Sequence, residues 1–94
     1  MKKLFVKENL IIWSDPNVYS QENHQYADTL REICELKLFT DWQQAANLAQ
    51  STEFNCNIIT SDINGEELTK RVTNKVHVNS IFVLRSNTTF LSNG

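Results

Sequence analysis

The sequence has very little glycine and proline. Its 94 residues include only two Gly, Gly65 and Gly94, and one Pro. This composition argues against a collagen-like repeat, a linker or a loop-rich scaffold. Without more glycine the chain has no glycine-rich phosphate loop, which excludes a Rossmann-type dinucleotide site. No serine lies in a Gly-x-Ser-x-Gly elbow, the nucleophile motif of many hydrolases. The commonest nucleotide-binding and hydrolytic motifs are therefore missing.

Cysteine and histidine are also scarce. Cys34 and Cys56 are the only cysteines, His24 and His77 the only histidines, and none has the spacing of a zinc-ligand set. We interpret both cysteines as reduced thiols of the hydrophobic core. A Cys34–Cys56 disulfide would apply only to a secreted chain. The sequence predicts no metal site and no cofactor.

Neither charge nor hydrophobic runs indicate nucleic-acid or membrane binding. The net charge is −2, from 9 basic and 11 acidic residues, which gives no electrostatic drive toward phosphate backbones or anionic lipids. The longest apolar run, 10–13, is far below the ~20 residues of a membrane span. The basic start at 1–8 is not followed by a signal-peptide core of ~7–15 apolar residues. We therefore expect a cytoplasmic protein.

What the chain does have is an alternation of strand-like and helical segments. Ser20 is a good N-cap for the first helix, Thr40 or Asp41 fits a capping box for the second, and Asn64 with Glu67 resembles one for the third. One face of the first helix gathers Tyr26, Ala27, Leu30, Ile33 and Cys34. The pattern predicts strands near 10–13, 36–39, 54–60 and 80–85, with helices near 20–35, from 40 onward, and near 65–74.

The order β-α-β-α-β-α-β predicts the fold class. Continuous apolar strands are typical of a parallel sheet covered on both faces. We expect a three-layer α/β/α sandwich, flavodoxin-like, with strand order 2-1-3-4 and the second strand at an edge, where Lys37 suits it. This arrangement is one βα unit short of the usual five-stranded sheet. It forms one domain over residues 10–86, with an N-terminal extension at 1–9 and a tail at 87–94.

Polar residues follow the two central strands. In open parallel sheets, ligands bind at the carboxyl ends of strands, where the connections diverge to opposite faces. Ser14 and Asp15 follow the first strand, and Ser61 and Asp62 follow the third. These four residues are the candidate ligand-binding group.

The same residues resemble the response-regulator receiver domain. Receivers carry acids after the first strand and a phosphoacceptor Asp after the third, which correspond to Asp15 and Asp62. The resemblance implies a Mg²⁺-dependent phosphoacceptor built from these two carboxylates. The chain departs from the pattern in having a single acid after the first strand, a shorter loop after Asp62, and no fifth strand to supply the receiver lysine. The alternative is a structural role, in which both acids shape turns and cap helices.

A second resemblance covers about residues 10–86. The segments that carry it are 12–17, 20–23, 29–31, 36–41, 58–61, 65–68 and 78–83. They resemble an α/β module, receiver-like or TIR-like, at the front of multidomain proteins in bdelloid rotifers, where it precedes ADP-ribosyltransferase regions or tetratricopeptide repeats. The resemblance implies an N-terminal interaction or regulatory module without established chemistry. Some TIR domains cleave NAD with a helical Glu, for which Glu66 and Glu67 are the nearest candidates; helix-capping and solvated roles are the alternative.

The last strand is the candidate interaction edge. Ile81, Phe82, Val83 and Leu84 form a continuous apolar run, and an unprotected apolar edge strand promotes association. We expect a protein partner or a second copy to cover it. The sequence thus predicts a non-catalytic protein-interaction or regulatory module, with the phosphoacceptor and NAD-cleaving functions as alternatives.

Overall fold

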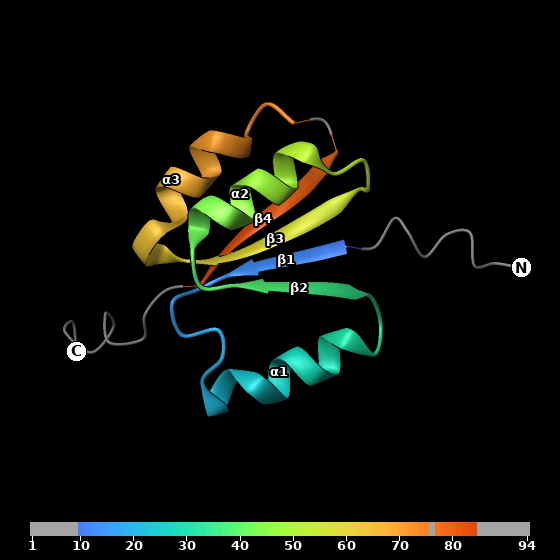
Figure 1. Ribbon diagram of the computed structural model, residues 1–94, viewed down its shortest axis with the longest axis vertical. Helices are drawn as coiled ribbons and strands as arrows, with labels where there is room; N and C mark the ends of the chain where they lie inside the picture. The colour runs from blue at the N-terminus through green and yellow to red at the C-terminus, as the bar shows by residue number, and fades with distance from the viewer. Residues whose placement is uncertain (1–9, 76, 85–94) are drawn as a thin grey trace, which may run out of the picture.

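The computed structural model describes residues 10–75 and 77–84 as three α-helices and four β-strands (Figure 1). Among these residues no helix is long and apolar enough to cross a membrane. The elements in chain order are β1 (Leu10–Ser14), α1 (Gln21–Arg31), β2 (Glu35–Phe39), α2 (Trp42–Ser51), β3 (Cys56–Ser61), α3 (Asp62–Val72) and β4 (Val78–Leu84).

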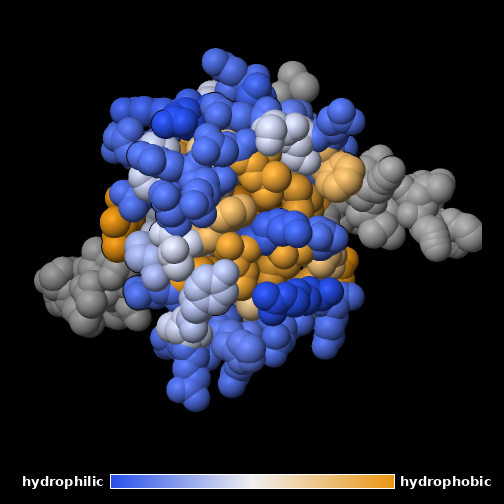
Figure 2. Space-filling model, viewed as in Figure 1, coloured by the Kyte–Doolittle hydropathy of each residue, from blue (hydrophilic) through white to orange (hydrophobic). Residues whose placement is uncertain are grey.

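The four strands form one parallel sheet in the order β2-β1-β3-β4, as the sequence predicts. In the register, Ile12 of β1 lies between Lys37 of β2 and Ile58 of β3. The central strands β1 and β3 are the most buried. The fold is a small α/β sandwich of the flavodoxin-like kind, with α2 and α3 on one side of the sheet and α1 on the other (Figure 1). In Figure 2 a band of apolar atoms, interrupted by polar residues, lies between the polar outer surfaces of these two helix layers.

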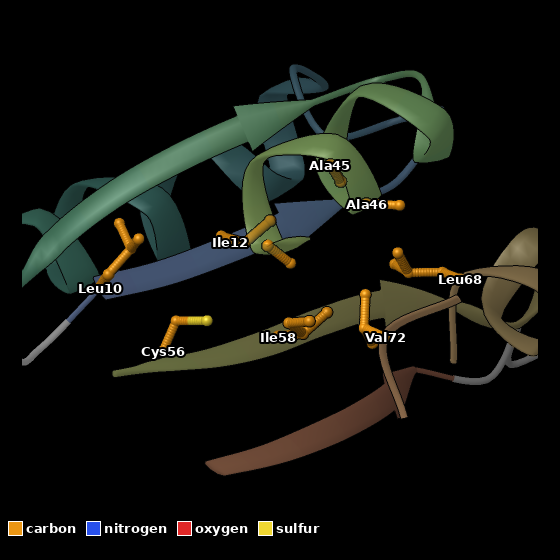
Figure 3. Packing of buried hydrophobic residues seen from close by; sticks show 9 residues of the cluster. Leu10, Ile12, Ala45, Ala46, Cys56, Ile58, Leu68 and Val72 are labelled. Carbon is orange, nitrogen blue, oxygen red and sulfur yellow. The ribbon is translucent and has the colours of Figure 1, made fainter. Parts of the chain in front are cut away.

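The larger core cluster lies between the sheet and the α2–α3 layer (Figure 3). Ala45, Ala46 and Ala49 are completely buried in α2, and their small side chains allow that helix to lie close to the strands. Leu68 and Val72, four residues apart on α3, complete the layer. The sheet contributes Leu10, Ile12, Cys56 and Ile58 to the same cluster.

The first helix is shorter than the sequence indicates. Ser20 caps it as expected, with its Oγ accepting the N–H of Asn23 at 3.3 Å. The helix ends at Arg31 rather than near residue 35, because the N–H groups of Ile33 and Cys34 both turn back to the carbonyl of Leu30, at 3.0 and 3.1 Å. The prediction of a wide apolar face is therefore wrong at two positions. Tyr26 and Ile33 are exposed, while Ala27 is buried.

The third helix begins earlier than predicted. It starts at Asp62, directly after β3, so the predicted loop and the capping box at Asn64 are wrong. Asn64 instead lies inside the helix as a kink, with non-helical φ −120° and ψ 16°. The kink lets Gly65 approach the sheet: a Cβ there would lie 3.3 Å from Cγ2 of Thr60 and 3.6 Å from Cγ1 of Val83. The tight approach of α3 thus depends on a glycine.

Candidate binding surface

The carboxyl end of β1 positions the first pair of predicted site residues. Ser14 is buried and lies opposite Thr60 of β3 in the register. The side chain of Asp15 accepts the N–H of Asn17 at 2.8 Å, and its carbonyl accepts the N–H of Val18 at 2.9 Å. Asp15 therefore stabilises its own turn, which is the structural role given above as the alternative.

The carboxyl end of β3 positions the second pair. Ser61 is buried and occupies the N-cap position of α3, yet its Oγ makes no capping bond and has no hydrogen-bond partner in the described part of the chain. Asp62 is exposed at the first position of α3, where a carboxylate stabilises the helix dipole. The topology thus brings both pairs to the same end of neighbouring strands.

The described residues contain no group of three or more His, Cys, Asp or Glu side chains suited to hold a metal ion. A Mg²⁺ site in a receiver-like arrangement would therefore rest on Asp15 and Asp62 alone. Saturable binding of Mg²⁺ with beryllofluoride, lost in Asp62→Asn, would be needed to support it. The phosphoacceptor function stays a prediction.

The two glutamates of α3 and the two cysteines lie in surroundings that indicate structural roles. Glu66 lies in the exposed first turns of α3 and pairs with Lys70 at 3.9 Å, while Glu67 is an exposed neighbour on the same helix. Burial raises the pKa of the Cys56 thiol, and burial together with the carboxylate of Glu35 raises the pKa of Cys34. Both thiols are therefore held protonated and are poor nucleophiles at neutral pH.

The side chains of the candidate interaction edge on β4 point alternately to the two faces of the sheet. Ile81 pairs in register with Ile58 and packs against the larger core cluster. Phe82 pairs with Ile59 on the opposite face, the face of α1, and is 56% exposed. Leu84, two residues further along, lies on that same face and is 44% exposed. Val83 is also exposed, so three of the four predicted residues present apolar surface to solvent.

A groove of about 840 Å³ opens on the α1 face beside β4. Trp13 of β1, Ile59 of β3 and Leu84 of β4 line it from the sheet. From α1 it is lined by Glu22, Asn23, Tyr26, Thr29 and Leu30. We call this cavity the α1–β4 groove. Its lining is mainly apolar with a few polar groups, which is the composition of a binding site.

Trp13 gives the groove an unsatisfied donor. The residue is only 3% exposed, and its indole Nε1 is buried without a hydrogen-bond partner in the described structure. A buried donor without an acceptor costs about 1–3 kcal/mol. Nothing in the sequence indicates this missing acceptor.

The sequence does not predict the groove, because helical periodicity assigns Tyr26 to the core. One signal does point to it. One helix covers roughly two strands, so the three helices of the described structure leave half of one face of the four-stranded sheet open.

No protein-family model, curated protein or solved structure matches this chain. Two surfaces of the molecule are therefore the candidates for function. One is the apolar β4 side with its groove. The other is the carboxyl ends of the central strands, with Ser14, Asp15, Ser61 and Asp62.

Proposed function

We propose that this chain is a protein-interaction module, without catalysis of its own, that binds through the β4 side of its sheet. One observation carries the proposal: Phe82 and Leu84, two residues apart on the α1 face of an outer strand, are both exposed apolar residues, and Val83 between them is exposed on the other face. Contiguous exposed apolar surface on a small domain marks interaction sites. The described helices leave this side of the α1 face open, and the groove extends the apolar surface toward α1.

The resemblance of residues 10–86 to the N-terminal modules of rotifer multidomain proteins is compatible with this proposal. In those proteins such a module accompanies domains with their own activities. A regulatory role and a cytoplasmic location, both expected from the sequence, belong to the same proposal. The polar residues at the strand ends give the proposed interaction less support, because the Asp15 side chain already accepts a hydrogen bond within its own turn.

The proposal is tested by selecting binders from a random peptide display library against immobilised protein. Parallel selections use Leu84→Glu, which places a charge on the β4 side, and the matched control Ile33→Glu. Ile33 is also an exposed apolar residue, 70% accessible, but it lies in the connection between α1 and β2. Both substitutions change exposed side chains, so neither should impair folding.

We expect peptides enriched on the wild type to bind Ile33→Glu equally well and Leu84→Glu at least about tenfold more weakly, a difference of ~1.4 kcal/mol. Enrichment that is indifferent to the charge at Leu84, or no enrichment over an unrelated protein, would overturn the proposal.

A further inference from the structure

The two faces of the sheet are covered to different extents. Strands in a sheet lie about 4.8 Å apart and a helix with its side chains is about 10 Å across, so one helix covers roughly two strands. On one face α2 and α3 together cover the sheet. On the other face α1 packs against β2 and β1 through Leu36, Leu38 and Trp13. The space over β3 and β4, within the described structure, has the width of one helix.

The α1 wall of the groove has helical spacing. Glu22, Tyr26 and Thr29 are separated by four and three residues and form one ridge along α1, with Asn23 and Leu30 beside it. Ridges of this spacing pack into the grooves of a second helix. Tyr26 is 63% exposed at the middle of the ridge, which is unusual for an aromatic ring of a small helix and gives an occupant a large surface to contact.

Charge and hydrogen bonding define the occupant further. Of the described residues that line the groove, Glu22 is the only charged one, and it favours a basic residue on the occupant. Trp13 contributes an indole N–H that lacks an acceptor. The indole N–H is buried, so an occupant reaches it only by displacing neighbouring side chains. A carbonyl or hydroxyl oxygen supplied there removes the cost of the unsatisfied donor.

We propose that the α1–β4 groove binds one amphipathic helix of a partner protein, which places an apolar stripe on Ile59 and Leu84 and a basic residue beside Glu22. A hydrogen-bond acceptor of this helix faces Trp13. The inference rests on the proposed interaction function and specifies the partner. It differs from strand addition at the edge of β4, which would use backbone hydrogen bonds and an extended peptide.

The test uses a synthetic amphipathic peptide of about 14 residues, ~21 Å long as a helix. It carries leucines at helical spacing on one face, a glutamine among them and a lysine at the border of that face. A scrambled peptide of the same composition is the control. Binding is followed by NMR through the indole N–H signals of the two tryptophans. Trp42 is the internal reference, since it packs against the larger core cluster on the opposite face, with the Arg71 guanidinium 5.2 Å from its ring centre.

We expect the helical peptide to shift the Trp13 indole signal downfield as it gains an acceptor, and to leave the Trp42 signal in place. Leu84→Glu should weaken binding at least about tenfold, and Ile33→Glu should not change it. Glu22→Lys should weaken binding by a smaller factor, and replacing the peptide lysine by glutamate should restore it. Because Glu22 is exposed, its substitution should leave the protein folded, and a loss of binding then reports the charge itself.

Three results would overturn the helix inference and leave the proposed function standing. The first is that display selection yields Leu84-dependent peptides with alternating, extended patterns while the helical peptide fails to bind. The second is that the Trp13 signal moves with protein concentration alone, which identifies a second copy as the occupant. The third is equal binding of the scrambled peptide.

Discussion

The two outer strands of the sheet differ in both their charge and their cover. On β2, Lys37 and Glu35 are exposed and pair at 3.4 Å, while Leu36 and Leu38 pack beneath α1 in the smaller core cluster. On β4 the exposed positions from Phe82 to Leu84 are all apolar. Charges on an edge strand, and lysine in particular, discourage pairing with other chains. The comparison shows that the same sheet protects one edge from association and leaves the other available for it.

The largest test of this comparison is the stability of alanine variants on the two strands. Leu38→Ala removes a side chain that packs beneath α1 and should lower the free energy of unfolding by about 2 kcal/mol. Phe82→Ala removes a larger but mostly exposed ring and should cost under ~1 kcal/mol. Urea denaturation of both variants measures the difference. A cost for Phe82→Ala as large as that for Leu38→Ala would mean that the ring is covered in solution.

Exchange of the edge charges is the second test. We expect the wild-type chain to self-associate as its concentration rises by edge-to-edge pairing of β4, which leaves the α1–β4 groove free and the Trp13 indole signal in place. Leu84→Lys should weaken that association by about tenfold, or ~1.4 kcal/mol. Lys37→Leu removes the protecting charge from β2 and should strengthen association. Sedimentation equilibrium over a wide concentration range measures all three proteins. A monodisperse wild-type monomer at high concentration would contradict the expected self-association through β4.

The smallest effect is the pH dependence contributed by the two thiols. Burial raises the pKa of Cys56 above the ordinary thiol value of 9.0, so the unfolded chain ionises first as the pH rises. The stability from this group is complete below that value and is lost as the pH rises through the higher pKa of the folded protein. Cys34, beside β2, acts in the same direction.

Denaturant midpoints measured from neutral to alkaline pH check this effect in the wild type, Cys34→Ala and Cys56→Ala. We expect each substitution to reduce the decline in stability on the alkaline side. An unchanged slope in both variants would show that other groups cause the decline.

The sequence predicts the sheet well because its signals are independent of tertiary contacts. Four apolar runs, one of them interrupted by Lys37, are enough to predict the parallel order and the position of β2 at an edge. The N-cap at Ser20 is local as well and is confirmed, and of the two candidates for the second helix, Thr40 and Asp41, the N-cap is Asp41. Asp41 accepts the N–H of Gln43 at 2.9 Å.

The candidate site is less predictable because it depends on packing between distant elements. The early start of α3 at Asp62 is set by the close approach of Gly65 to Thr60 and Val83, which local propensity does not contain. The exposure of Tyr26 depends on how much of the sheet α1 covers. The unsatisfied indole of Trp13 can be recognised only when every neighbouring acceptor is placed.

The strand order also has a consequence for assembly during synthesis. Of the described strands, β1 emerges first and occupies the interior of the sheet, with β2 on one side and β3 on the other, and β4 adds beyond β3. Each new strand therefore joins a free edge, and none has to be inserted between two strands that are already paired. The sheet can grow outward in the order in which the ribosome delivers it, and β4 is the last of the described strands to join.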